Sequence, residues 1–253
     1  MPIDLNCDMG ESFGRYTLGC DAEVIPLISS ANIACGFHAG DPVVMEKTVQ
    51  LAAEHGVGIG AHPAFPDLVG FGRRDLHMSA VELRNAIIYQ LGALHGFARI
   101  AGRPLRHVKP HGALYTLAAN DDALSQTIVD AVTAFDESLI VFGLAGSSFL
   151  DIARKVGLRV AREAFADRAY TDAGTLVPRQ QPDGVITDSS AIVERMLQMI
   201  EDHTVTSVTG TRIPLHIDTI CVHSDTPGAV EHVRRMSEAL CQAGITIAPV
   251  KTS

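Results

Sequence analysis

Side chains that can hold a charge or carry a proton recur directly after the predicted strands of this 253-residue sequence. They follow six of seven predicted strands, and each is a carboxylate, an imidazole or a cation. Carboxylates and imidazoles act as general acids and bases, and ammonium or guanidinium groups stabilise developing negative charge. Their recurrence predicts an active site built at one end of the strands. In chain order they are Asp8, Glu11, His38, His62, His107, Lys109, His111, Glu163, Asp167, Arg168, His223 and Asp225.

Two chemistries remain open for this group, with a third less favoured. Asp8, His38 and His62 can bind a divalent metal, because two imidazoles and a carboxylate leave an open position for water. Metal-free acid/base catalysis is the second, with Asp8, Glu163 and Asp225 as carboxylates, His62 and His111 as proton carriers and Lys109 as electrostatic stabiliser. A nucleophilic triad is least favoured, because the chain contains no G-x-S-x-G segment.

The residues after the third strand form a long predicted loop that ends in two arginines. Arg73 and Arg74 can clamp a carboxylate or phosphate with paired hydrogen bonds, or they can simply close the loop in solvent. No G-x-x-x-x-G-K-[ST] segment occurs in the chain, so the residues alone predict no nucleotide site.

Several other polar residues have structural interpretations. Asp41 precedes Pro42 and is predicted to cap a helix. Three cysteines, Cys7, Cys35 and Cys221, sit in apolar strands and are predicted to be small core residues. Five histidines on predicted helices or their ends are predicted surface or capping residues: His55, His77, His95, His203 and His232.

Short apolar runs alternate with amphipathic runs along the chain, which predicts repeated βα units and a parallel sheet covered by helices. Capping residues predict where helices begin: at Asp41, in the Ser79–Glu82 capping box, at Asn120 or Asp121, at Ser147 or Ser148, at Asp188 and at Thr226-Pro227. The predicted strands cover 2–7, 30–35, 57–61, 105–109, 139–144, 158–163 and 219–223, with an eighth left open at 245–250.

We expect a single α/β domain, 1–253, built as a distorted barrel of about seven parallel strands. A doubly wound sheet is disfavoured because no G-x-G-x-x-G follows the first strand. Residues 166–187 are predicted to cross one face, and 205–217 to form a hairpin around Thr209-Gly210. In a parallel barrel the carboxyl ends of the strands share one rim, where barrel active sites are built.

Composition excludes several classes of function. The net charge is −9 and aromatic residues are 5% of the chain, which argues against nucleic-acid binding. There is no polybasic patch, leader or long apolar run, so no membrane role is expected. Five cysteines without C-x-x-C spacing fit a reducing cytoplasm.

Six segments together resemble the LamB/YcsF family, the group of the A subunit of ATP-dependent 5-oxoprolinase. They span most of the chain: DLNCDMGESFG (4–14), NIACGFHAGDP (32–42), GAHPAFPDLVGFGRR (60–74), HVKPHGALY (107–115), EAFADRAYTDAGTLVPR (163–179) and DTICVHSDTPGA (218–229).

The resemblance implies a distorted seven-stranded barrel similar to those of glycoside hydrolases and polysaccharide deacetylases. It also implies that ATP and two waters convert 5-oxo-L-proline to L-glutamate, ADP and phosphate, together with subunits B and C. ATP would bind either this chain or a partner. Two alternatives are a metal-dependent deacetylase or amidase that needs no ATP, and a non-catalytic subunit that organises its partners.

For the implied reaction we expect Lys109 and Arg73 to neutralise developing charge, and Asp8 or Glu163 to activate water. His62 or His111 would protonate the leaving nitrogen. Candidate substrate-binding residues are Asn6, Arg73, Arg74, Asp167, Arg168, His223 and Asp225.

Overall fold

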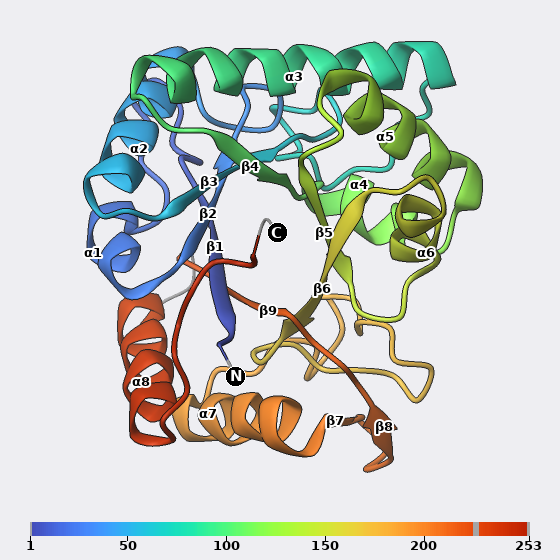
Figure 1. The fold of residues 1–253 in the computed structure, drawn as a ribbon. Helices are drawn as coiled ribbons and strands as arrows, with labels where there is room; N and C mark the ends of the chain where they lie inside the picture. The colour runs from blue at the N-terminus through green and yellow to red at the C-terminus, as the bar shows by residue number, and fades with distance from the viewer. Residues whose placement is uncertain (1, 225–227, 252–253) are drawn as a thin grey trace.

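The computed structural model describes residues 2–224 and 228–251. Seven parallel strands close into a barrel, and the last of them pairs with both its predecessor and the first strand (Figure 1). This confirms the predicted fold class. Around the barrel the strands are β1 (Asp4–Met9), β2 (Ser30–Ala34), β3 (Gly58–His62), β4 (Leu105–Val108), β5 (Ile140–Leu144), β6 (Arg159–Phe165) and β9 (Thr219–Val222).

Helices surround the barrel, and the predicted caps form at several of their ends. Asp41, Asp121 and Asp188 each accept backbone N–H bonds at a helix N-terminus, and Ser79 forms the capping box with Glu82. The helices are α1 (Asp21–Val24), α2 (Pro42–Glu54), α3 (Ala80–Ile100), α4 (Gly112–Ala118), α5 (Asp122–Phe135), α6 (Ser148–Lys155), α7 (Ser189–Leu197) and α8 (Ala229–Gln242), with a 3-10 turn at Ile25–Leu27 and a π turn at Gln198–Asp202.

The eighth strand left open at 245–250 is not formed. Thr219 in β9 pairs with Asp4 on one side and Glu163 on the other, so the barrel has no free edge left for another strand. The segment forms an isolated bridge between Ile247 and Ile3, the residue before β1, and adds no strand to the barrel. The predicted hairpin is confirmed as β7 (Thr204–Thr206) and β8 (Arg212–Pro214). Thr226 and Pro227, predicted to start the last helix, lie outside the described residues.

The barrel interior holds many buried polar side chains beside a small apolar group of Ile140, Phe142 and Ala161, whereas the space between barrel and helices is apolar. Side chains alternate along a strand, so in β1 Asp4, Asn6 and Asp8 face inward while Leu5 and Cys7 join the outer core. Asp4 accepts hydrogen bonds from Ser29, Ser30 and Thr219 at 2.5–2.7 Å. Burial raises the pKa of Asp4 to about 6, although these hydroxyls lower it. The inward-facing polar side chains of β1 thus extend from the barrel interior to Asp8 at the rim.

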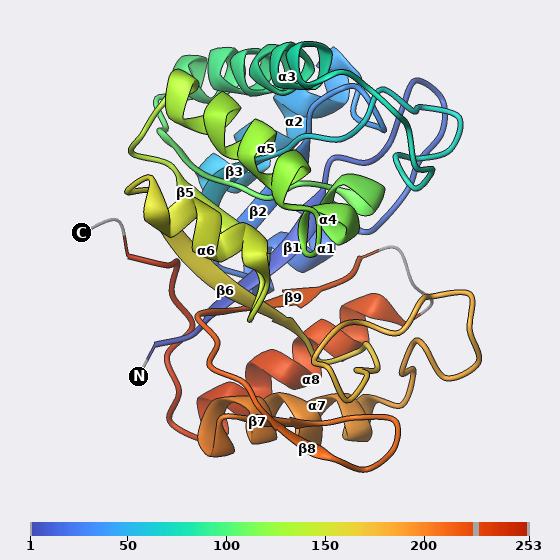
Figure 2. The same ribbon diagram turned by 90° about the vertical axis from the view of Figure 1, so that its right-hand side faces the viewer.

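The loops after the strands gather at one end of the barrel, and the segment 166–187 (gold) extends over this end (Figure 2). Among the described residues no helix is both long enough and apolar enough to cross a membrane.

Candidate active site

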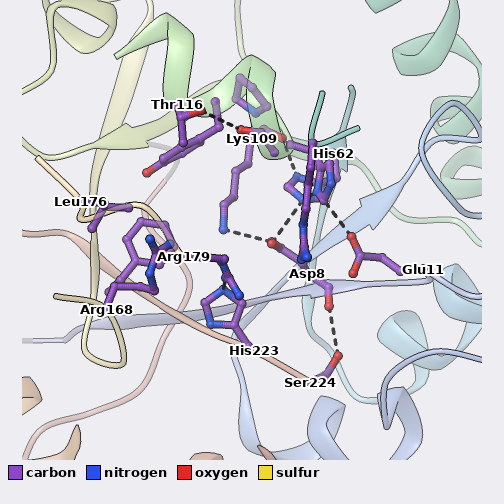
Figure 3. Close-up of a pocket in the computed structure, with 16 residues that line it drawn as sticks. Asp8, Glu11, His62, Lys109, Thr116, Arg168, Leu176, Arg179, His223 and Ser224 are labelled. Atoms are coloured by element: carbon purple, nitrogen blue, oxygen red, sulfur yellow. Dashed lines mark hydrogen bonds and ion pairs between the residues drawn. The ribbon is translucent and has the colours of Figure 1, made fainter. Parts of the chain in front are cut away.

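A pocket opens at the carboxyl ends of the strands, where the polar residues were predicted to meet (Figure 3). Asp8 of β1 and His62 of β3 contribute to its lining, as do Lys109 and His223, which directly follow β4 and β9. Its polar lining consists of Asp8, Glu11, His62, Arg73, Lys109, His111, Tyr115, Thr116, Arg168, Arg179, His223 and Ser224.

Lys109 lies at the bottom of this pocket and is almost completely buried. Its Nζ lies 3.0 Å from Asp8 Oδ1 and 2.9 Å from Glu163 Oε1. It also lies 3.2 Å from Asn6 Oδ1 and 3.1 Å from Cys221 Sγ. Burial disfavours the charge, but these neighbours, Asp8 first, hold the pKa of Lys109 well above its usual value. Lys109 is therefore a fixed cation at neutral pH.

Asp8 lies between this cation and the histidines. Asn32 donates to Asp8 Oδ1 at 2.9 Å, and His62 Nε2 lies 3.3 Å from Asp8 Oδ2. Burial would raise the pKa of Asp8, but His62 and Lys109 hold it well below its usual value. Because Asp8 also lines the pocket, it is an ionised carboxylate within reach of a bound molecule.

Glu163 and Asn6 lie beneath Lys109 and do not line the pocket. Both are completely buried, and Asn6 Nδ2 donates to Glu163 Oε1 at 2.8 Å. Asn32 in turn donates to Asn6 Oδ1 at 2.7 Å. The structure thus places these predicted catalytic and substrate-binding residues where they position Lys109. Asn32 was not predicted because its role depends on this packing.

His62 and His111 lie side by side on the pocket wall. His62 Nε2 is 3.0 Å from His111 Nδ1, and the two rings are nearly perpendicular, at 86°. Burial, followed by the charges of His38 and His62, holds the pKa of His111 well below its usual value. Both predicted proton carriers are therefore in one place, next to Asp8.

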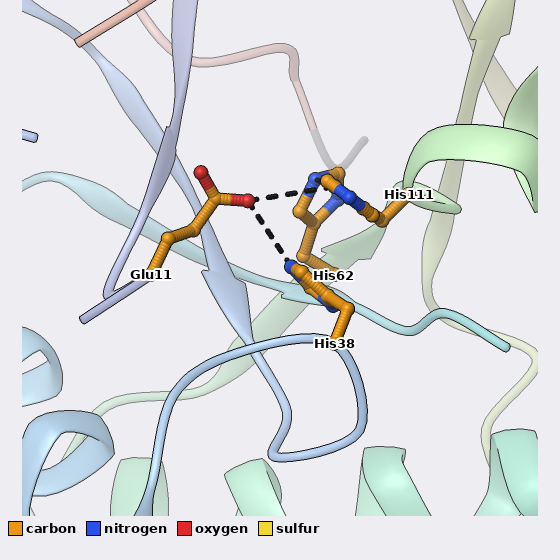
Figure 4. A group of neighbouring side chains, drawn as sticks. All are labelled: Glu11, His38, His62 and His111. Carbon is orange, nitrogen blue, oxygen red and sulfur yellow. Dashed lines mark hydrogen bonds and ion pairs between the residues drawn. The ribbon is translucent and has the colours of Figure 1, made fainter. Parts of the chain in front are cut away.

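Four side chains here could hold a metal ion: Glu11, His38, His62 and His111 (Figure 4). One ligand atom from each lies within 4.8 Å of the others. Of the predicted metal ligands, His38 and His62 belong to this group, whereas Asp8 does not. Glu11 and His111 are its other two members. Glu11 follows β1 by two residues and His111 follows β4 by three, so sequence order alone could not show that they meet.

A second charged group lies across the pocket. His223 Nδ1 is 2.5 Å from Asp167 Oδ2, and Arg179 Nη2 donates to His223 Nε2 at 2.5 Å. Burial would raise the pKa of Asp167, but His223 and the charge of Arg179 hold it below its usual value. Arg179 was not predicted. Arg179 is the last residue of the 163–179 motif, and this position was the one feature of the sequence that could have marked it as a site residue.

The remaining predicted arginines differ in their positions. Arg73 lines the pocket, and its guanidinium lies 4.9 Å from the centroid of the Phe71 ring. Arg74 is instead exposed and pairs with Asp67, away from the pocket lining. Arg168 lines the pocket, but its Nε and Nη2 donate to the carbonyls of Gly184 and Val177. Asp225 lies outside the described residues.

The structural interpretations of the other residues agree with their positions. Cys7, Cys35 and Cys221 are buried, although Cys221 also contacts Lys109. Asp41 caps α2. The five helix-associated histidines, His55, His77, His95, His203 and His232, do not line the pocket.

The family model of the LamB/YcsF family matches residues 3–253. The chain belongs to this family. A relative from Pyrococcus furiosus, named as the A subunit of 5-oxoprolinase, is 50% identical over 99% of this chain and 98% of its own length. A relative of the same name from Limosilactobacillus fermentum is 54% identical over 97% and 98%. The crystal structure of a lactam utilization protein from Thermus thermophilus superposes with a TM-score of 0.94, at 47% identity over 98% of this chain and 99% of that one.

Proposed function

We propose that this chain is the A subunit of an ATP-dependent 5-oxoprolinase, and that the rim pocket opens the lactam ring of 5-oxo-L-proline. The observation that carries the proposal is the pairing of the buried Lys109 ammonium with the pocket-lining Asp8 carboxylate, 3.0 Å apart. Relatives of about 50% identity over nearly the whole chain bear the name of this subunit.

The reaction needs activation because a five-membered lactam is a stabilised amide. ATP phosphorylates the lactam oxygen, and water adds to the activated carbon. The carbon–nitrogen bond then breaks, and the ring nitrogen takes a proton. A second water releases phosphate, giving L-glutamate, ADP and phosphate.

In this proposal Lys109 stabilises the negative charge that develops on the lactam and phosphoryl oxygens, because a fixed buried cation needs no reorganisation. Asp8 accepts the proton of the attacking water. Its low pKa makes it a weak base, which suffices for an activated carbon. His62 or His111 delivers the proton to the leaving nitrogen. Glu163 and Asn6 are positioning residues that hold Lys109.

The substrate carboxylate requires a cation across the pocket from Lys109. Arg179 lines the pocket and is oriented by His223, which Asp167 holds in turn. We assign the carboxylate to Arg179, with Arg73 as the second cation of the pocket. Arg168 supports the 166–187 segment, since its guanidinium binds two carbonyls of that segment.

The test is glutamate release from 5-oxoproline by the chain alone and with subunits B and C, each with and without ATP. We expect release only with both partners and ATP. The histidine and carboxylate cluster favours a second candidate, a metal-dependent amidase. Turnover by the chain alone without ATP, lost on chelation, would replace the proposal with that one. Full turnover with an Asp8→Asn chain in the complex would instead leave this chain with an organising role.

A further inference from the structure

Two imidazole nitrogens face each other in the pocket wall at 3.0 Å, His62 Nε2 and His111 Nδ1. The other nitrogen of each ring fixes where the protons are. His62 Nδ1 lies 2.7 Å from the carbonyl oxygen of Lys109, and His111 Nε2 lies 2.8 Å from that of Phe71. A carbonyl oxygen only accepts, so each of these two nitrogens carries the hydrogen. In the neutral rings both facing nitrogens therefore present lone pairs.

Two lone pairs at this distance repel each other unless a cation or a proton lies between them. The surrounding groups add negative charge. Glu11 Oε1 lies 3.4 Å from His111 Nδ1, and Asp8 Oδ2 lies 3.3 Å from His62 Nε2. His62 and His111 are both buried. The arrangement concentrates electron pairs around one point.

The separations match those between ligands of one metal ion. Metal–nitrogen and metal–oxygen bonds of about 2.0–2.2 Å place neighbouring ligand atoms roughly 3.3–3.6 Å apart in a tetrahedral site, and roughly 2.8–3.1 Å apart at the 90° angles of a five-coordinate one. His111 Nδ1 lies 3.0 Å from His62 Nε2 and 3.4 Å from Glu11 Oε1. Metal-bound histidines usually donate their other N–H to a carbonyl or carboxylate, as His62 and His111 do here.

The His38 ring is placed differently from those of His62 and His111. Its ring is stacked on that of His111, with centroids 3.7 Å apart and planes only 8° from parallel. A cation in the plane of the His111 ring lies outside the plane of His38, so His38 is poorly oriented as a ligand. Its Nε2 is 3.1 Å from Glu11 Oε1, which places it to hold that carboxylate.

We propose that His62 Nε2, His111 Nδ1 and Glu11 Oε1 bind one divalent transition-metal ion, with His38 orienting Glu11. Two imidazoles and one carboxylate suit Zn²⁺ and leave a position open for substrate or water. The ion would supply Lewis-acid chemistry beside Asp8 and Lys109. The proposal rests on the proposed function only in placing the ion within the same pocket. With the ion bound, His62 and His111 would be ligands in place of the proton-donor role given to them above. The test of the site does not use turnover.

The experiment starts from the full-length chain stripped with a chelator and dialysed. Zn²⁺ binding is measured by calorimetry and by elemental analysis after gel filtration, and Co²⁺ serves as the spectroscopic probe. We expect one Zn²⁺ per chain, and visible Co²⁺ bands typical of a four- or five-coordinate site. A wild-type chain that retains no Zn²⁺ and gives only the spectrum of aqueous Co²⁺ would overturn the proposal, and would favour a shared proton between the two rings.

Variants then locate the ion. His111→Ala and Glu11→Gln are expected to weaken Zn²⁺ binding at least about a hundredfold, and His38→Gln about tenfold, the lower end of the range for outer-shell partners. The matched control is His55→Ala, an exposed histidine at the end of α2 that should bind like wild type. Unchanged binding in both His111→Ala and Glu11→Gln would overturn the assignment. Circular dichroism checks the folding of each variant, and the wild-type result stands if one fails to fold.

The two proposals can fail separately. Zn²⁺ binding at this site without ATP-linked glutamate release would contradict the proposed function alone. ATP-dependent turnover by a complex in which this chain binds neither Zn²⁺ nor Co²⁺ would contradict the metal site alone.

Discussion

The ammonium nitrogen of Lys109 lies 2.9 Å from Glu163 Oε1, and the glutamate is completely inaccessible to solvent. The same ammonium lies 3.0 Å from Asp8, so one cation pairs with two carboxylates at the bottom of the pocket. A buried charge that loses its partner is strongly destabilising. The pairing therefore links the stability of the barrel to the chemistry of its rim.

Lys109→Met is expected to abolish glutamate formation and to destabilise the chain by about 3 kcal/mol, because both carboxylates lose their buried partner. Urea unfolding measures the second effect on the isolated chain. Lys155→Met, at an exposed position on α6, is the matched control and should change neither quantity. A Lys109→Met chain as stable as wild type would contradict the buried pairing.

Arg179→Gln should raise the KM for 5-oxoproline about 30-fold, since a charge-assisted hydrogen bond to a carboxylate contributes about 2 kcal/mol. The folding of the variant should be unaffected, because Arg179 is only half-buried. Arg74→Gln serves for comparison, because Arg74 pairs with Asp67 outside the pocket lining. Equal KM values for the two variants would remove Arg179 from substrate binding.

His107 should make the chain less stable in mild acid. Burial, followed by the charge of Lys109, lowers the pKa of His107 to about 3. An unfolded histidine titrates near 6.5, so the contribution of His107 is complete above that pH and is lost as pH falls towards 3. Between pH 7 and pH 5 the loss is about 2 kcal/mol.

The measurement is urea unfolding at both pH values for wild type and His107→Gln, whose side-chain amide can still donate to Asn32. The fall in the free energy of unfolding from pH 7 to pH 5 should be about 2 kcal/mol smaller in the variant than in wild type. The exposed His77→Gln should keep the wild-type difference. Identical pH dependence in wild type and His107→Gln would show that His107 does not titrate as described.

Gly60→Ala should destabilise the chain by about 2 kcal/mol, because a Cβ at this position in β3 would overlap the His107 ring. His107 would then lose its position against Asn32 and Phe142. Gly96→Ala is the matched control, since a Cβ there meets nothing within 4 Å inside α3. That change should stabilise the chain by about 0.5–1 kcal/mol. A Gly60→Ala chain with wild-type stability would mean that the ring can move.

Much of the barrel could be predicted because its signals are local. Continuous apolar runs mark strands buried on both faces, and capping residues such as Asp41, Ser79 and Asp188 mark helix starts. α4 was missed because its N-cap, His111, makes no side-chain capping bond. The segment 245–250 has the composition of a strand, but barrel closure through β9 leaves it no partner.

The rim itself was predictable because residues that follow parallel strands share one end of the barrel. The contacts between particular rim residues could not be predicted. The contact of His111 with His62 and that of Arg179 with His223 join segments more than 40 residues apart. The separation of Glu163 from the pocket lining depends on the length of the Lys109 side chain above it. Such relationships follow from packing and not from spacing along the chain.

The most direct test of the central claim compares glutamate formation by the complete complex, with ATP, when this chain is wild type or Asp8→Asn. We predict a fall of about a thousandfold, within the range for loss of a general base, with unchanged circular dichroism. Asp151→Asn, on the exposed side of α6, should keep wild-type turnover. An Asp8→Asn complex that forms glutamate at the wild-type rate would contradict the claim that the ring is opened in this pocket.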